Sequence, residues 1–317
     1  MKIIGGHFEL ELKNGKEYHP DALALNSGRN SLLYVLKAKQ IRTLYLPRYI
    51  CQSVIDTVKS EGVSITFYDL ENDFSPKLQR FDLKNNEFLL YVNYFGLGEN
   101  NIDSLITKTP NIIVDNTQAF FSPPRKGIDT IYSPRKFFGV PDGGYLYTNT
   151  FLDLSLEDEE SSRMSSHLLL RMEKGFEGSK QLYQRHEEMI NRLILKRMSK
   201  LTSRILESVD YNAVLKRRLR NMELYQNHLA TLNDLHVPTT IAPLVYPFYL
   251  KGKGDDLRQK LKKKGIIVTR YWASAFSRLS SGSFEDDLAT DLIGLPIDQR
   301  YNDKDISYVS KTIKSLL

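Results

Sequence analysis

The sequence has little cysteine and no long apolar run. Cys51 is its single cysteine among 317 residues, which excludes an intramolecular disulfide and a zinc site built from several thiolates. No stretch approaches the roughly 18 consecutive apolar residues of a membrane span. Charged residues return at Glu9, so no signal-peptide apolar region forms near the N-terminus. One thiol and no membrane span predict a cytoplasmic protein in a reducing compartment.

Internal repeats and low-complexity tracts are also missing. Hydrophobic residues make up 41% and charged residues 26% of the chain, which excludes intrinsic disorder, collagen and disulfide scaffolds. The net charge is +6 and the isoelectric point is about 9.1. This charge permits nucleic acid, an anionic membrane surface or an anionic small substrate as partner, and it does not choose among them.

Residues 20–150 alternate strand and helix signals in the order of βαβ units. A helix is predicted after the polar segment Asn26-Ser27-Gly28, and another over residues 53–60 that ends at Gly62. Continuous apolar runs are typical of strands buried in a parallel sheet. Strands are predicted at residues 42–46, 63–68, 88–92, 111–114, 130–132 and 145–148.

Residues 155–234 carry helical spacing and almost no strand signal. Their basic residues suggest a helix that binds an anion or nucleic acid, but no aromatic residues interleave them to stack on bases. The favoured alternative is a solvated helix face with acidic partners at Glu187, Glu188, Glu207 and Glu223. The basic residues are Arg192, Lys196, Arg197, Lys200, Arg204, Lys216, Arg217, Arg218 and Arg220.

The C-terminal part returns to mixed α/β signals. We predict strands at residues 242–250 and 266–268, a helix at 256–264 closed by Gly265, and a terminal amphipathic helix at 306–317. The predicted domains are therefore a large one over residues 1–234, with α/β structure at 20–150 and helices at 155–234, and a small α/β one over residues 235–317.

The strongest local motif is a lysine on a loop, Ser133-Pro134-Arg135-Lys136-Phe137-Phe138, ahead of the turn Asp142-Gly143-Gly144. A lysine held among apolar neighbours becomes a usable amine nucleophile. In isolation, the simpler interpretation of Lys136 is a surface lysine.

Two further motifs stand where α/β sheets bind ligands. Asp115 ends an apolar strand and starts Asp-Asn-Thr-Gln, so it is either a ligand-binding acid or a helix cap. Ser27-Gly28-Arg29 opens a helix, whose backbone N–H groups form a natural phosphate site. A phosphate site, then an acid at a strand end, then a loop lysine is the order that pyridoxal 5′-phosphate requires.

With these motifs in order, the sequence resembles the DegT/DnrJ/EryC1/StrS-type sugar aminotransferases. Residues 20–150 carry the resemblance well and residues 240–300 weakly. Lys136 precedes Gly143 and Gly144 by the family's seven and eight residues. The other matching segments are residues 26–33 (family S-G-T-x-A-L), 46–51 (P-x-Y-T), 62–69 (G-x-x-x-x-F-x-D), 92–96 (V-H-L-Y-G) and 114–119 (E-D-x-A-Q-A).

The resemblance implies a type I pyridoxal-phosphate aminotransferase fold, with a large, mostly parallel sheet domain and a smaller C-terminal α/β domain. Lys136 would form the Schiff base and Asp115 would hold the pyridine nitrogen protonated. Gln118 would sit beside the ring. Gly28 and Arg29 would give backbone N–H groups to the phosphate and Ser133 its hydroxyl, with Ser27 at the same helix start. Cys51 would lie against the ring face or, as the favoured alternative, be a buried core thiol. No metal site is predicted.

Three departures from the family concern the substrate side. Ser133 stands three residues before Lys136 where the family has five, Asn93 replaces a histidine, and the family's G-x-N-Y-R-M segment has no counterpart. We predict a homodimeric aminotransferase that takes an amino group from an amino acid to a nucleotide-linked keto sugar in surface polysaccharide biosynthesis. The alternative is a non-catalytic relative that binds a sugar nucleotide or a pathway partner, and nucleic-acid binding is the least favoured hypothesis.

Overall fold

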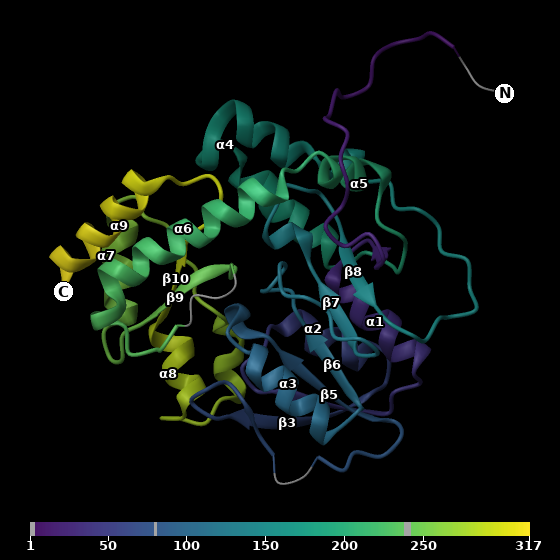
Figure 1. Cartoon of the computed structure of the whole chain (residues 1–317), viewed down its shortest axis with the longest axis horizontal. Helices are drawn as coiled ribbons and strands as arrows, with labels where there is room; N and C mark the ends of the chain where they lie inside the picture. Colours follow the sequence, from purple (N-terminus) through teal and green to yellow (C-terminus); the bar gives the residue numbers. More distant parts are fainter. Residues whose placement is uncertain (1–3, 79–80, 238–241) are drawn as a thin grey trace.

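A mixed sheet of eight strands, in the order β1-β8-β7-β6-β5-β2-β3-β4, forms the centre of the larger unit (Figure 1). The computed structural model describes residues 4–78, 81–237 and 242–317. The strands are β1 (Leu23–Leu25), β2 (Thr43–Pro47), β3 (Ser64–Leu70), β4 (Pro76–Lys77), β5 (Glu87–Val92), β6 (Ile112–Asp115), β7 (Asp129–Tyr132) and β8 (Gly144–Tyr147).

The five central strands, β7, β6, β5, β2 and β3, are parallel, whereas β1, β8 and β4 pair antiparallel. The chain adds β3 on one side of β2, and it adds β6 and β7 on the opposite side of β5. The strand order therefore reverses between β2 and β5, the point at which open α/β sheets bind ligands outside the carboxyl ends of their strands. Asp115 is the last residue of β6, and Ser133 follows β7 at the same edge.

Helices cover both faces of this sheet (Figure 1). α1 (Gly28–Ala38) and α2 (Gln52–Ser60) pack against each other on one face, and α3 (Glu99–Lys108) covers the opposite one, as right-handed crossovers require. Ser27 caps α1, because its Oγ accepts a hydrogen bond from the Asn30 amide at 3.1 Å. Gly62 follows α2 with a φ of +68°. The predicted start of α1 and the predicted end of α2 before Gly62 are confirmed, whereas α2 begins one residue earlier than predicted and α3 was not predicted.

The middle of the chain is helical, as predicted. It forms α4 (Ser166–Ile190), α5 (Lys200–Glu207) and α6 (Tyr211–Leu229). α4 is kinked at Gly175, where φ is +67°. α6 packs along the C-terminal helix α9 (Asp303–Leu316), at the left of Figure 1. No helix among the described residues is long and apolar enough to cross a membrane.

The C-terminal unit is built on an antiparallel pair, β9 (Val245–Tyr249) and β10 (Leu292–Pro296), with α7 (Gly254–Lys263) and α8 (Phe284–Asp291). The predicted strand at 266–268 is wrong. Only Thr269 forms a bridge, to Gly294, and Ile267 is 55% exposed. The Tyr271 ring lies beside Gly294, where a Cβ atom would be 2.8 Å from Tyr271 Cε2. The domain boundary at 234–235 stays a prediction, and residues 238–241 lie outside the described residues.

Candidate active site

Asp115 and Lys136 meet through Thr117. The buried Asp115 carboxylate accepts a hydrogen bond from the Thr117 amide at 2.9 Å through Oδ1. The Lys136 ammonium donates to the Thr117 hydroxyl, with Nζ 2.9 Å from Oγ1. The fold therefore brings the strand-end acid and the loop lysine to one place. Thr117 was not among the predicted residues, and its only signal in the sequence is its position between Asp115 and Gln118.

The lysine loop is anchored by the two residues that follow Lys136. Phe137 and Phe138 are buried and pack on Phe120, with ring centroids 5.6 and 5.0 Å away. The Lys136 side chain itself is exposed. The expectation that apolar neighbours enclose the amine is therefore wrong for this chain, because the two aromatic rings turn inward and hold the backbone instead.

Gly28, Thr117 and Ser133 converge at the N-terminus of α1. A Cβ atom at Gly28 would lie 3.3 Å from Thr117 Cγ2 and 3.5 Å from Ser133 Cβ. Ser133 is buried, and Ser27 keeps its hydroxyl hydrogen free to donate while its oxygen caps the helix. The amides of a helix's first turn and nearby hydroxyl groups together form an anion site.

The Gly143-Gly144 pair fits against this helix start. Gly143 has a φ of +119°, and its amide donates to Asn26 O at 2.9 Å. A Cβ atom at Gly144 would lie 2.4 Å from Ser27 C and 2.5 Å from Gly28 N. The backbone of β8 approaches Ser27 and Gly28 so closely that only glycine fits at position 144.

Gln118 presents an unused donor. Its Oε1 accepts a hydrogen bond from the Phe95 amide at 2.9 Å, which fixes the orientation of the side-chain amide. Nε2 is buried and has no partner in the described part of the chain. Because buried donors are nearly always paired in folded proteins, an orphaned one beside Thr117 marks a place for an oxygen of a ligand.

The Arg29 side chain is directed away from the start of α1, which agrees with the expectation that only its backbone N–H would bind the phosphate. The Arg29 guanidinium donates to Ile190 O at 2.7 Å and Leu193 O at 3.1 Å, so only the backbone of Arg29 remains for a phosphate. Cys51 is half-buried at the start of α2, with Sγ 3.2 Å from Ser53 Oγ. The core-thiol interpretation of Cys51 is therefore wrong, and its place against a cofactor ring stays a prediction.

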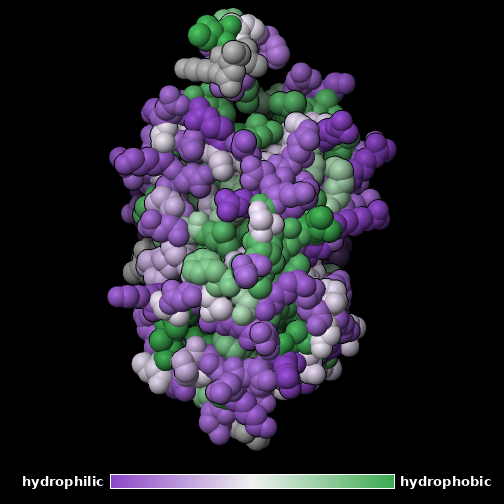
Figure 2. Space-filling view, turned by 90° about the vertical axis from the view of Figure 1, so that its right-hand side faces the viewer, coloured by the Kyte–Doolittle hydropathy of each residue, from purple (hydrophilic) through white to green (hydrophobic). Residues whose placement is uncertain are grey.

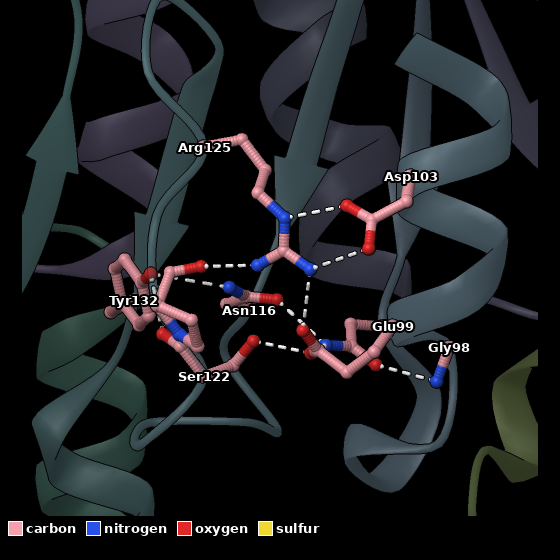
Figure 3. Close-up of polar contacts among 9 residues, drawn as sticks. Gly98, Glu99, Asp103, Asn116, Ser122, Arg125 and Tyr132 are labelled. Atoms are coloured by element: carbon pink, nitrogen blue, oxygen red, sulfur yellow. Dashed lines mark hydrogen bonds and ion pairs between the residues drawn. The ribbon is translucent and has the colours of Figure 1, made fainter. Parts of the chain in front are cut away.

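A polar network holds the ends of β5 and β6 behind the site (Figure 3). Asn93, in place of the family's histidine, donates to Glu99 Oε1 at 2.7 Å and to Asn116 Oδ1 at 3.0 Å. Ser122 donates to the same Glu99 oxygen. Arg125 binds Glu99 Oε2 at 2.9 Å, and the loop from Asp115 to Arg125 is therefore fixed at both ends.

Arg218, a member of the basic run on α6, supports the lysine loop from the C-terminal side. Its guanidinium is 1% exposed, lies 4.6 Å over the Phe137 ring and donates to Pro243 O at 3.0 Å. Burial lowers its pKa to about 10. Gln299 Nε2 also donates to Phe137 O, at 2.9 Å. No local pattern in the sequence distinguishes this arginine from its basic neighbours.

Other members of the basic runs have acidic partners, which favours the solvated-face interpretation. These pairs are Arg204–Glu207, Arg220–Glu223, Arg217–Asp303, Lys196–Glu157 and Lys200–Asp158. Two of the four predicted acidic partners, Glu207 and Glu223, are among them, whereas Glu187 pairs with Arg135.

Comparison with solved structures identifies the fold. No family model matches the chain, and no curated protein matches its sequence. NtdA from Bacillus subtilis with bound cofactor PMP superposes with a TM-score of 0.65 at 14% identity, over 93% of this chain and 73% of that one. The PMP form of Spr1654 from Streptococcus pneumoniae, described as a putative sugar aminotransferase, gives a TM-score of 0.61 at 15% identity, over 93% of this chain and 87% of that one.

A DegT DnrJ EryC1 StrS aminotransferase from Brucella abortus is also similar, with a TM-score of 0.60 at 15% identity, over 93% of this chain and 85% of that one. The chain has the fold of these aminotransferases. The fold class predicted from the motifs is confirmed, and so is the resemblance at the level of the fold.

Proposed function

We propose that this protein is a pyridoxal-phosphate-dependent aminotransferase that acts on a nucleotide-linked keto sugar in surface polysaccharide biosynthesis. The observation that carries the proposal is the contact of Lys136 Nζ with Thr117 Oγ1, 2.9 Å away, beside the strand-end carboxylate of Asp115. The resemblance to sugar aminotransferases of the same fold supports the substrate class. When bound, the cofactor supplies an electron sink that stabilises a carbanion next to nitrogen.

Asp115 and Gln118 would orient the ring. Asp115 Oδ1 is occupied by the Thr117 amide, and Oδ2 accepts no hydrogen bond from the described residues. That oxygen is available to keep a pyridine N–H protonated. The orphaned Gln118 Nε2 is a donor for the phenolic oxygen of the ring.

The start of α1 would hold the phosphate. Backbone N–H groups of Gly28 and Arg29, together with the Ser27 and Ser133 hydroxyls, provide donors, and the helix dipole favours the negative charge. The Arg29 side chain would add no positive charge at this point, because its guanidinium is directed to the end of α4.

Lys136 would act as the general acid–base. Its Nζ would take a proton from the substrate carbon that bears the amino nitrogen and would return it to the carbon on the other side of that nitrogen. Thr117 Oγ1 accepts a hydrogen bond from Nζ and would limit the positions that the amine can take.

A homodimer would complete the site. The Lys136 side chain is exposed, so a single chain leaves the reacting amine open to water. Large apolar side chains are exposed in the loop after β8, at Phe151 and Leu154, and on α4, at Met172. Figure 2 shows apolar side chains gathered within a largely hydrophilic face. Together with the resemblance, these exposed groups support association of two copies.

The test uses the purified protein loaded with pyridoxal phosphate. Addition of L-glutamate should bleach the visible absorbance of the bound cofactor, and a nucleotide-linked keto sugar should restore it. If the cofactor binds but no amino acid changes the spectrum, the aminotransferase proposal is wrong and the non-catalytic alternative is favoured.

A further inference from the structure

The last turn of α4 contacts the lysine loop on both sides of Lys136. Glu187 forms an ion pair with Arg135, the residue before Lys136. His186 lies one position earlier on the helix, and its Nε2 donates to Pro141 O at 2.6 Å. Both contacts reach the loop from the same helix turn, so the backbone around Lys136 is tied to α4 at residues 135 and 141.

The same end of α4 also contacts the phosphate segment. Arg29 donates to three carbonyls at or just beyond the helix C-terminus, those of Ile190, Asn191 and Leu193. The last carbonyls of a helix lack partners within it and carry its partial negative charge, so a guanidinium is well suited to them. Asn30, one residue further along α1, donates to Ile194 O at 2.9 Å.

The His186 part of these contacts is buried, whereas the Glu187 side chain is partly exposed. His186 is buried and stacks on His167, with ring centroids 4.0 Å apart. Burial raises the pKa of Glu187, but His186 and Arg135 outweigh it and lower that pKa to about 2. Glu187 is therefore ionised at neutral pH, and the charge pair with Arg135 is permanent.

We propose that residues 186–193 form a brace that fixes the Lys136 loop relative to the start of α1, with Glu187 and Arg29 as positioning residues. This inference rests on the proposed function, because it assigns the brace the task of setting the distance between the reacting amine and the phosphate site. A cofactor bound at both points is sensitive to any relative movement of the two loops.

The experiment compares Glu187→Gln with Glu188→Gln in the full chain. Both variants make the same chemical change at adjacent positions, but Glu188 is exposed and forms no ion pair within the described residues. Dissociation constants for pyridoxal phosphate are measured by fluorescence quenching well below the melting temperature of each protein. Visible circular dichroism reports the orientation of the bound chromophore.

Glu187→Gln should raise the dissociation constant about tenfold, the equivalent of about 1.4 kcal/mol, and reduce the visible dichroism per bound cofactor. Glu188→Gln should match the wild type. A second variant, Arg29→Met, keeps the backbone N–H and should weaken binding similarly.

A lower melting temperature for Glu187→Gln, with unchanged affinity and dichroism, would make the contact merely structural and overturn the brace. Absence of cofactor binding to the wild type would instead refute the proposed function, and the brace with it.

Discussion

Gly144→Ala tests whether β8 must approach the start of α1 as closely as the structure places it. The added Cβ would lie 2.4 to 2.5 Å from Ser27 C, Ser27 O and Gly28 N. Ordinary contacts of this kind are about 1 Å longer, and all three atoms are backbone, so a side-chain rotation cannot relieve the overlap. To accommodate the added Cβ atom, either β8 or the backbone of Ser27 and Gly28 has to move.

Overpacking of this kind costs typically 1–3 kcal/mol, and backbone neighbours place Gly144→Ala at the upper end, about 3 kcal/mol. With about 2–4 °C per kcal/mol for a domain of this size, the melting temperature should fall by about 6–12 °C. Differential scanning fluorimetry measures this shift, and a cofactor titration should show weakened binding.

The matched control is Gly139→Ala in the same loop. Gly139 is exposed, and a Cβ there would make an ordinary 3.7 Å contact with Leu168 Cδ2. This variant should melt within about 2 °C of the wild type. If Gly144→Ala were as stable as Gly139→Ala, the close packing of β8 on the helix start would be refuted.

Two further predictions concern stability. Glu99→Gln should lower the free energy of unfolding by about 1.5–3 kcal/mol, because it removes the charged acceptor that Arg125 shares with two neutral donors. Asp103→Asn, at the exposed end of the same arginine, should cost less than about 1 kcal/mol, and equal losses in urea denaturation would contradict this. Burial lowers the pKa of His19 to about 4, below its ordinary value of 6.5, so the unfolded chain binds the proton more readily. Stability should therefore fall as pH drops from 6.5 to 4, by up to about 3 kcal/mol, and His19→Phe should flatten this slope in denaturant titrations at several pH values.

The central sheet was predictable because its strands and helices carry strong local signals. Apolar runs such as residues 88–92 and 112–114 form buried parallel strands, and the second of these leads into the site residue Asp115. Short elements that depend on distant partners were missed. β1 has three residues and exists through its pairing with β8, which lies more than a hundred residues away. The segment at 266–268 has the apolar composition of a strand, but a strand also needs a partner, and only Thr269 beside it forms a bridge, to Gly294.

Within the candidate site, order along the chain predicted which residues meet, but not how they are held. Thr117 connects Asp115 to Lys136 only because the lysine side chain points towards its hydroxyl group, and no local sequence pattern predicts that direction. Arg218 was expected to be a surface or anion-binding charge, and the Arg29 side chain had no predicted role. Both guanidinium groups instead satisfy backbone carbonyls of distant segments. A buried arginine and an exposed one have the same sequence signature when burial comes from elements far along the chain.

One measurement tests the central claim most directly. The protein is loaded with pyridoxal phosphate and reduced with borohydride, which turns a lysine–cofactor Schiff base into a stable secondary amine, and its peptides are analysed by mass spectrometry. The account predicts that Lys136 carries the phosphopyridoxyl group and that Lys136→Ala carries none. Labelling of another lysine, or none in the wild type, would contradict the assignment of this loop, this strand end and this helix start to one cofactor site.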